Sequence, residues 1–366
     1  MSVPFIDLQR QYLEVKTEVD NAIKEVLAGG WYIGGAVVAE FEQKFAEYIG
    51  VKQCISCGNC TDGLELLLRA YGIGPGDEVI VPAFTWITDA EVVSLVGAKV
   101  VFADILSDEY TIDPVSIESQ ITEKTKAIIV VHLYGRPCRM EAIMALADRY
   151  NLKVIEDCAQ AAGAKYNHKR VGAIGHAAAF SFYPTKNLGA YGDGGAVTTN
   201  DEALATKLRL MANHGQKERD NHIIEGKNSR LDPIQAAALL IKLKYLDQWN
   251  NRRKVIAAQY TSQFSEMDGI ICPQPSDDHI YHIYGIRVEN REALKAHLSH
   301  YKIQTAIHYP KALPELAAYS HLKLSIDQYP VSGNLASQEL SLPVFPELTN
   351  DEVAEVIRGV GLFFDK

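Results

Sequence analysis

Seven short β-rich runs alternate with segments of helical periodicity between residues 53 and 199, and this alternation is the feature that most limits the fold. Such an order is typical of a parallel sheet whose strands are joined by crossover helices. The sequence therefore predicts an α/β architecture for this part of the chain. The expected strands cover residues 53–57, 78–81, 99–103, 127–132, 153–157, 177–182 and 195–199.

Two of the intervening segments have the pattern of amphipathic helices. Residues 62–72 place apolar side chains at i, i+3, i+4 and i+7, which lie on one face of a helix. The second helix is expected to begin at a capping Asp201 and to stop at Gly215. Both segments therefore fit the crossover helices that a parallel sheet requires.

The pattern changes in the last third of the chain. A long helical pattern rich in Leu, Ala and Lys starts at about residue 235. It is followed by an expected strand at 281–288, a helix at 291–301 and a strand at 303–309. We therefore expect a large α/β domain over residues 1–249 and a smaller α+β domain over residues 250–366, with an N-terminal segment that can pack on the small domain.

Charge and hydropathy disfavour several classes of partner. The chain has a formal net charge of -10 and no block of Lys and Arg, which disfavours a general nucleic-acid or anionic-membrane surface. No apolar run is long enough to span a bilayer, and the N-terminus is charged where a secretory segment would be apolar. We expect a cytoplasmic protein that binds neither nucleic acid nor membrane and keeps most of its six cysteines as thiols.

Two residues that follow expected strands carry the strongest chemical signal. Ligands of open parallel sheets bind beyond the carboxyl ends of the strands. Lys186 lies in a glycine-rich loop after one strand, and Asp157 ends another, where its carboxylate needs a cationic partner. Together they suit pyridoxal phosphate. Its aldehyde forms a Schiff base with a lysine, and its ring withdraws electrons while a nearby Asp keeps the ring nitrogen protonated.

The phosphate of such a cofactor needs backbone amides, hydroxyls and a helix N-terminus. The sequence CTDG at residues 60–63 comes directly before the helical run LELLLRAYG. Thr61 is expected there both to cap the helix and to bind the phosphate.

The motifs PAFTWITDAE, VIEDCAQAAGA, FSFYPTKNLGAYGDGGAVTTND, HGQ, KNSRLDPIQAA and AIHYP occur in this order along the chain. In combination they resemble the DegT/DnrJ/EryC1/StrS family of sugar aminotransferases, which are fold-type-I pyridoxal-phosphate enzymes. The resemblance covers essentially the whole chain. It implies a mostly parallel seven-stranded sheet with flanking helices and a smaller C-terminal α+β domain.

The resemblance also implies roles for residues around the cofactor ring. Lys186 would form the Schiff base, and Asp157 would pair with the pyridinium nitrogen. Gln160 would face the phenolic oxygen of the cofactor. Trp86 would stack on the ring, whereas Phe84 beside it is expected to belong to the core.

The implied phosphate ligands include Ser181 and Thr61. Asn228 matches a family asparagine that reaches the phosphate from the other subunit, so a homodimer with two shared active sites is implied. The chain departs from the family at Cys60, which stands where the family usually has glycine. The Cys60 backbone N–H can still serve the phosphate if its φ is negative, but the side chain must find room.

The implied activity is transamination, because dehydrating relatives carry His at the position of Lys186. The pattern is most like the 3-aminotransferases of dTDP-3-keto-6-deoxyhexoses, with glutamate as amino donor. A UDP-linked 3-keto hexosamine or uronate and a 4-keto sugar remain alternatives, and the final glycan is left open. The residues expected near the substrate are Tyr183, Arg230, His308 and Tyr309.

Three other classes fit the sequence less well. Cys54, Cys57 and Cys60 have the spacing of metal ligands, but the first two fall on one strand and face opposite sides of it, so no metal site is expected. The glycines of YGIGPGDE follow a helix and precede a strand, which is the reverse of a dinucleotide-binding loop. A noncatalytic regulator that binds pyridoxal phosphate is disfavoured by the intact Lys186 and Asp157.

Overall fold

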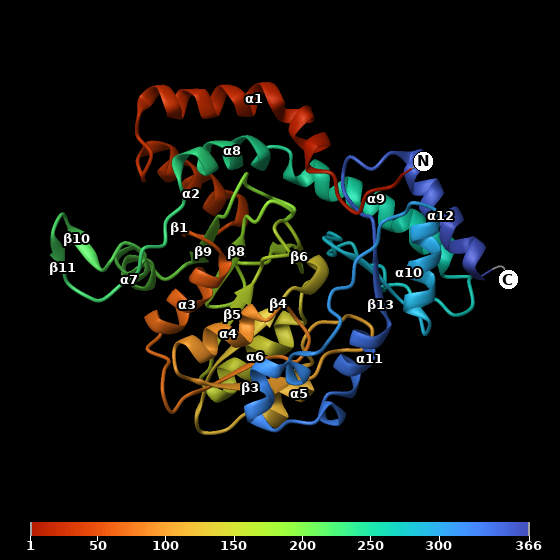
Figure 1. Cartoon of the computed structure of the whole chain (residues 1–366). Helices are drawn as coiled ribbons and strands as arrows, with labels where there is room; N and C mark the ends of the chain where they lie inside the picture. Colours follow the sequence, from red (N-terminus) through yellow and green to blue (C-terminus); the bar gives the residue numbers. More distant parts are fainter. Residues whose placement is uncertain (1, 365–366) are drawn as a thin grey trace.

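A seven-stranded sheet lies at the centre of the larger part of the molecule in this computed structural model, which describes residues 2–364 (Figure 1). The strand order is β1-β9-β8-β5-β4-β2-β3, and β9 alone among them runs antiparallel to its neighbours. The predicted α/β class and mostly parallel sheet are therefore confirmed. The seven strands are β1 Gln53–Cys57, β2 Glu78–Pro82, β3 Lys99–Ala103, β4 Thr125–Val131, β5 Lys153–Asp157, β8 Ala177–Ser181 and β9 Gly195–Thr199.

The remaining strands pair two by two outside this sheet. They are β6 Lys165–Tyr166, β7 Lys169–Arg170, β10 Gln216–Glu218, β11 Asn221–His222, β12 Tyr284–Arg287 and β13 Glu339–Leu342. The α-helices are α1 Leu8–Gly29, α2 Ala36–Ile49, α3 Cys60–Ala70, α4 Thr88–Leu95, α5 Pro114–Gln120, α6 Met140–Tyr150, α7 Glu202–Ala212, α8 Pro233–Leu243, α9 Leu246–Phe264, α10 Arg291–His300, α11 Pro330–Gln338 and α12 Asn350–Phe364. Short 3₁₀ helices are η1 Leu133–Gly135, η2 Leu313–Glu315, η3 Ala317–Leu322 and η4 Ile326–Gln328.

Helices cover both faces of the sheet because successive strand residues point to opposite sides. On β8, Ala177 and Ala179 belong to the hydrophobic core formed with α3, α4 and α7. Ala178 and Phe180 belong to the core formed with α2 and α8 on the other face. The strands are buried on both faces, as expected for a sheet that is mainly parallel.

The C-terminal part has a core of its own. Helices α9, α10 and α12 pack with β12 and β13, and Val3 from the N-terminal segment is buried among them. Val3 donates its N–H to the carbonyl of Lys302, 2.9 Å away, and accepts from the N–H of Gln304. The domain boundary expected after residue 249 falls inside α9, which contributes Leu246 to the core beneath α2 and α8 and Ile256 to the C-terminal core.

Several expected element limits were wrong. Residues 303–309 do not form a strand, because Ile303 and Ala306 pair singly with two different partners, Val3 and Ser341, and no continuous ladder results. The long helical pattern from residue 235 is interrupted at Lys244 and Tyr245, between α8 and α9.

Two expected helix limits also differ from the structure. Helix α7 ends at Ala212, three residues before Gly215, although Asp201 caps its start as predicted. The cap of α3 is Asn59 and not Thr61. Asn59 has extended backbone angles and its side chain accepts from the N–H of Asp62 at 2.8 Å, whereas Thr61 is already the second helical residue.

No helix within residues 2–364 is long and apolar enough to cross a membrane. A hairpin formed by β10 and β11 projects from the body of the molecule, at the opposite end from the two chain termini (Figure 1).

Candidate active site

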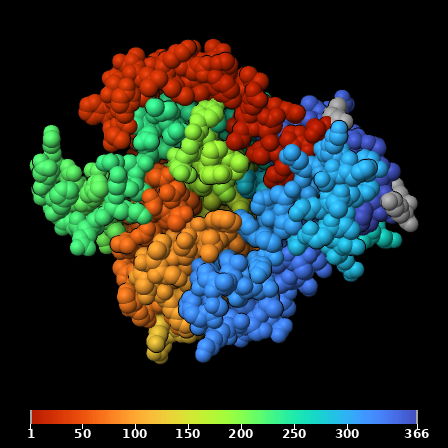
Figure 2. Space-filling model, in the orientation of Figure 1, coloured from red at the N-terminus to blue at the C-terminus, as the bar shows by residue number. Residues whose placement is uncertain are grey.

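The predicted site lies at the edge of the sheet where the parallel strands β1, β2, β5 and β8 end. Asp157 is the last residue of β5, and Lys186 follows β8 by five residues. In Figure 2 the yellow-green part of the chain, which carries these residues, reaches the surface in the middle of the face. The N-terminal helix, the orange segment after β2 and the blue C-terminal part frame it.

Lys186 lies partly buried in the loop after β8. Burial lowers the pKa of its amine below the usual lysine value, against the raising effect of Asp157, Cys60 and Asp89. Within residues 2–364 no carboxylate lies within ion-pair distance of this amine. The amine is thus available as a nucleophile or a base.

The loop that carries Lys186 is held by buried amides that sequence reasoning missed. The side chain of Asn187 donates to Asn250 Oδ1 at 2.7 Å, and its own Oδ1 lies 2.9 Å from Nδ1 of His282. Asn250 in turn donates to the carbonyl of Ala162 at 3.0 Å. These residues come from separate elements, and no local motif joins them in the sequence.

Asp157 is buried and well supplied with donors. Its Oδ1 accepts from the N–H of Ala159 at 2.7 Å and lies 3.8 Å from the thiol of Cys60. The structure therefore brings Asp157, Cys60 and Lys186 together. The sequence had predicted that Asp157 and Lys186 lie close to each other.

The start of α3 provides the polar cradle expected for a phosphate. Cys60 is its first residue and does not have positive φ. Its side chain finds room in the core beside Asp157, with burial, Asp157 and Asp89 raising the pKa of the thiol. A Cβ at Gly195 would come within 2.8 Å of the Cys60 nitrogen, so glycine is required for the close approach of β9. Thr61 lies beside Thr88, with 3.3 Å between the hydroxyls.

The aromatic residues expected around the cofactor differ in exposure. Trp86 is 57% exposed, with its ring centroid 5.5 Å from that of Tyr309, so its indole face is free to stack on a ring. Phe84 is buried in the core, as predicted. Gln160 accepts from the N–H of Tyr134 at 2.6 Å and donates to the Tyr309 hydroxyl at 3.1 Å.

The expected substrate residues occupy two regions. His308 lies near Lys186, and its Nδ1 is 2.8 Å from the hydroxyl oxygen of Ser341. Burial, followed by the charge of Lys186, lowers the pKa of His308 to about 4. Tyr183 is 52% exposed after the end of β8, and its N–H donates to Ser181 Oγ at 3.2 Å. Arg230 instead donates to Asn213 Oδ1 at 3.0 Å.

Asn228 is exposed on the segment that returns from the β10–β11 hairpin. Its neighbours anchor this segment to α3. Lys227 binds Asp62 at 2.6 Å and Glu65 at 2.7 Å, and Ser229 donates to Asp62 at 2.6 Å. The exposed Asn228 side chain therefore stands on a backbone that its neighbours fix to α3.

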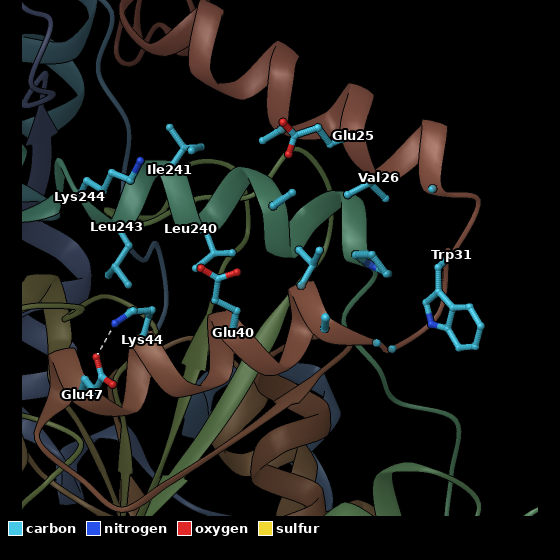
Figure 3. A pocket seen from close by; sticks show the side chains of 18 of the residues that line it. Glu25, Val26, Trp31, Glu40, Lys44, Glu47, Leu240, Ile241, Leu243 and Lys244 are labelled. Atoms are coloured by element: carbon cyan, nitrogen blue, oxygen red, sulfur yellow. Dashed lines mark hydrogen bonds and ion pairs between the residues drawn. The ribbon is translucent and has the colours of Figure 1, made fainter.

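A cavity of about 1050 Å³ lies away from the strand-end site, between α1, α2 and α8 (Figure 3). Its lining is mainly apolar, with Leu240 and Ile241 from α8, and its polar residues include the ion pair of Lys44 and Glu47 at 3.0 Å. None of the residues of the strand-end site contributes to it.

The three cysteines near the N-terminus of α3 do not converge on one point. Cys54 packs with α2, whereas the Cys57 sulfur lies on the side of α3, and Cys60 contacts Asp157. This agrees with the expectation that Cys54 and Cys57 face opposite sides of β1.

A different trio, His132, Glu156 and Cys158, has its ligand atoms within 4.8 Å of one another. Glu156 is saturated with hydrogen bonds: it accepts from His132 Nε2 at 2.9 Å and from the N–H groups of Gly172, Ile174 and Gly175. His132 Nδ1 accepts from the N–H of Cys138 at 3.0 Å. The network therefore supports the fold beneath the site.

We expect the substitution Glu156→Gln to lower the free energy of unfolding by roughly 3 kcal/mol near pH 7, because the amide nitrogen would face buried donors. Burial raises the pKa of Glu156, but His132 and the backbone donors outweigh it, so the net pKa is lowered. Its stabilisation is thus present above the unfolded pKa and is lost as pH falls through the folded pKa. Urea unfolding should show the difference from wild type shrinking below about pH 4.3, the ordinary pKa of glutamate. Glu123→Gln on the surface should leave stability unchanged, and an equally large effect there would contradict this account.

Comparison with known proteins identifies the family. The model of the DegT/DnrJ/EryC1/StrS aminotransferase family matches residues 14–361. The chain belongs to this family. The aminotransferase class predicted from the sequence is therefore confirmed, and with it the assignment to pyridoxal-phosphate enzymes.

Two curated relatives match nearly full length. The "dTDP-3-amino-3,6-dideoxy-alpha-D-galactopyranose transaminase" of Aneurinibacillus thermoaerophilus is 47% identical, covering 99% of both chains. The "Erythromycin biosynthesis sensory transduction protein EryC1" of Saccharopolyspora erythraea is 46% identical, covering 98% of both. The crystal structure of DesV from S. venezuelae in complex with a ketimine intermediate superposes with a TM-score of 0.98 at 42% identity, covering 100% of this chain and 99% of DesV.

Proposed function

We propose that this protein is a pyridoxal-phosphate transaminase that converts a dTDP-3-keto-6-deoxyhexose into the dTDP-3-amino-3,6-dideoxyhexose, with glutamate as amino donor. The observation that carries the proposal is the meeting of Lys186, Asp157 and the start of α3 at one edge of the sheet. The 47% identity to the transaminase from A. thermoaerophilus supports the sugar class.

Bound pyridoxal phosphate would supply an aldehyde that condenses with amines and a ring that withdraws electrons. Lys186 would anchor it and, once displaced by the donor amine, would use Nζ to take the proton from the donor α-carbon. The lowered pKa of Lys186 favours the neutral amine that this step needs. The same Nζ would return a proton when the ketosugar is aminated.

Asp157 would hold the ring nitrogen in its protonated form, since a buried carboxylate favours a cationic partner. Trp86 would cover one face of the ring, and its exposure leaves the indole free to do so. Gln160 would donate a hydrogen bond to the phenolic oxygen. Its amide nitrogen now donates to the Tyr309 hydroxyl, so it would have to share or give up that hydrogen bond.

The backbone N–H of Cys60 and the hydroxyls of Thr61 and Ser181 would bind the phosphate, because a helix N-terminus favours anions. On the substrate side, we assign Tyr183, His308 and Tyr309 to the sugar nucleotide. Arg230 would reach the substrate only by exchanging its contact with Asn213.

The proposed assembly is a homodimer with two shared sites, in which Asn228 reaches the phosphate of the partner subunit. The exposed side chain of Asn228 on an anchored backbone supports this, as does the projecting β10–β11 hairpin with its exposed Ile223 and Ile224 (Figure 1). The proposed setting is the cytoplasm, which agrees with six free cysteines.

Subunit mixing tests the shared sites. Asn228→Ala should weaken cofactor binding about tenfold, the usual effect of losing a hydrogen bond to a charged group. Co-expressed dimers of Asn228→Ala and Lys186→Ala chains should contain one intact site, which combines Lys186 and Asn228 from different chains. That site should bind the cofactor with wild-type affinity and transfer amine. Mixed dimers with no gain over the separate variants would reject sharing, and Asn221→Ala on the exposed hairpin is the control.

The substrate assignment is tested with a panel of nucleotide sugars. The protein is incubated with glutamate and, separately, with dTDP-3-keto, dTDP-4-keto and UDP-3-keto sugars, and mass spectrometry detects the replacement of a carbonyl by an amine. We expect the dTDP-3-keto-6-deoxyhexose to react with the highest kcat/KM. Conversion of 4-keto sugars alone would overturn the C3 assignment, and preference for a UDP sugar would overturn the nucleotide.

A further inference from the structure

A second buried carboxyl group lies behind Asp157. Asp89, in the first turn of α4, is 1% exposed. Its Oδ2 accepts from the hydroxyl of Thr85 at 3.0 Å. Its Oδ1 is fully enclosed and has no hydrogen-bond partner in the part of the chain that the structure describes. An ionised carboxylate left in this state would carry a large desolvation cost.

The carboxyl of Asp89 lies within hydrogen-bonding reach of the carboxyl of Asp157. Two carboxylates this close do not both ionise, because one proton shared between them removes the repulsion. Burial and then the charge of Asp157 raise the pKa of Asp89 well above the usual range. The other titratable groups on which the charge of Asp89 acts are Cys60 from α3, Lys186, Tyr309 and Tyr319.

The distribution of donors decides which carboxyl holds the proton. Asp157 already accepts from the N–H of Ala159 and lies beside the thiol of Cys60, so its negative charge is solvated by the protein. Asp89 has the hydroxyl of Thr85 and its own backbone N–H as donors, and its Oδ1 has no partner within the described residues. The arrangement therefore favours the charge on Asp157 and the proton on Asp89.

We propose that Asp89 is a positioning residue that, in its neutral form, donates its O–H to the Asp157 carboxylate and fixes the orientation in which that carboxylate meets the ring nitrogen of the cofactor. The proposal rests on the proposed function in that Asp157 is the partner of the ring. Ala159, Cys60 and Asp89 would then all donate to the Asp157 carboxylate. The thiol of Cys60, which stands where the family usually has glycine, would be one of these three donors.

The protonation of Asp89 is tested first, on the protein without cofactor. Infrared difference spectroscopy between wild type and Asp89→Asn near pH 7 should show the carbonyl band of one buried protonated carboxyl group, present in wild type and absent in the variant. The control Glu91→Gln, an exposed carboxyl in the same turn of α4, should leave the band in place. Absence of the band from wild type would overturn the proposal, and this result does not depend on catalysis.

The positioning role is tested on the cofactor-loaded protein. Asp89→Asn keeps an N–H donor of the same shape, so we expect cofactor affinity close to wild type and an unchanged protonated ring nitrogen in ¹⁵N spectra of labelled pyridoxal phosphate. Asp89→Ala should weaken cofactor binding about tenfold and lower the protonated fraction, because a hydrogen bond to a charged group is lost. Equal defects in both variants would overturn the role of the donor.

Thr85→Val offers a second variant if Asp89→Ala unfolds. This substitution removes a donor to Oδ2 of Asp89 and leaves the Asp89 O–H on Asp157, so the infrared band should persist with a shifted frequency. Loss of the band in Thr85→Val would contradict the proposal. If wild type fails to bind pyridoxal phosphate, the proposed function fails, whereas the infrared result still decides whether the two carboxyl groups share a proton.

Discussion

Replacing Lys186 with alanine is expected to abolish the visible absorbance of the cofactor-loaded protein and to lower the rate of amine transfer by at least about 10²–10⁴-fold. The magnitude is that of a positioned side chain in proton transfer, and loss of the covalent anchor adds to it. The pKa of Lys186 is lowered by burial, which favours the neutral amine in wild type. Absorbance spectra and initial rates with glutamate and ketosugar provide the measurement.

Lys186→Arg is the matched variant, because it keeps the positive charge but cannot form the Schiff base. It should be as inactive as Lys186→Ala while retaining the fold, as judged by the unfolding transition. A visible spectrum that survives in either variant would show that another residue anchors the cofactor.

The substitution Asp157→Asn should lower kcat/KM by roughly 10²–10⁴-fold, because it removes one partner from a buried charge pair worth about 3–5 kcal/mol. The asparagine amide cannot hold the ring nitrogen in its protonated form. The fraction of protonated ring nitrogen, measured by ¹⁵N spectroscopy of labelled cofactor, should fall with the rate. An unchanged fraction would remove Asp157 from the proposed role.

The neighbour of Asp157 provides an internal comparison. Successive residues of a strand point to opposite faces, and Glu156 on the other side of β5 binds His132 and backbone amides. Glu156→Gln should therefore lower the stability and leave the ring-nitrogen signal unaltered. Asp157→Asn should change the ring-nitrogen signal and leave the stability unaltered.

The sheet was predictable because its strands are local patterns. All seven expected strands exist within two residues of their expected limits, from β1 to β9. Asp157 and Lys186 were predictable as neighbours because parallel strands end at a common edge. The resemblance to a family added the remaining candidates, among them Arg230, whose side chain binds Asn213, and the exposed Asn228.

The unpredicted features depend on contacts between distant segments. Asn187, Asn250 and His282 hold the Lys186 loop through buried hydrogen bonds across 95 residues of sequence. Asp89 meets Asp157 although 68 residues separate them in the sequence, and α4, which carries Asp89, packs beside α3. The strand expected at 303–309 was wrong for the same reason, since its residues found two different partners and no shared one.

The most direct test of Lys186-centred transamination is the first half of the reaction, measured alone. Purified protein loaded with pyridoxal phosphate is mixed with glutamate and no sugar, and 2-oxoglutarate is quantified while the visible spectrum is recorded. We predict one 2-oxoglutarate per chain together with loss of the visible band, and neither change in Lys186→Ala. Absence of 2-oxoglutarate with any tested amino donor, or its formation by the Lys186→Ala variant, would contradict the account.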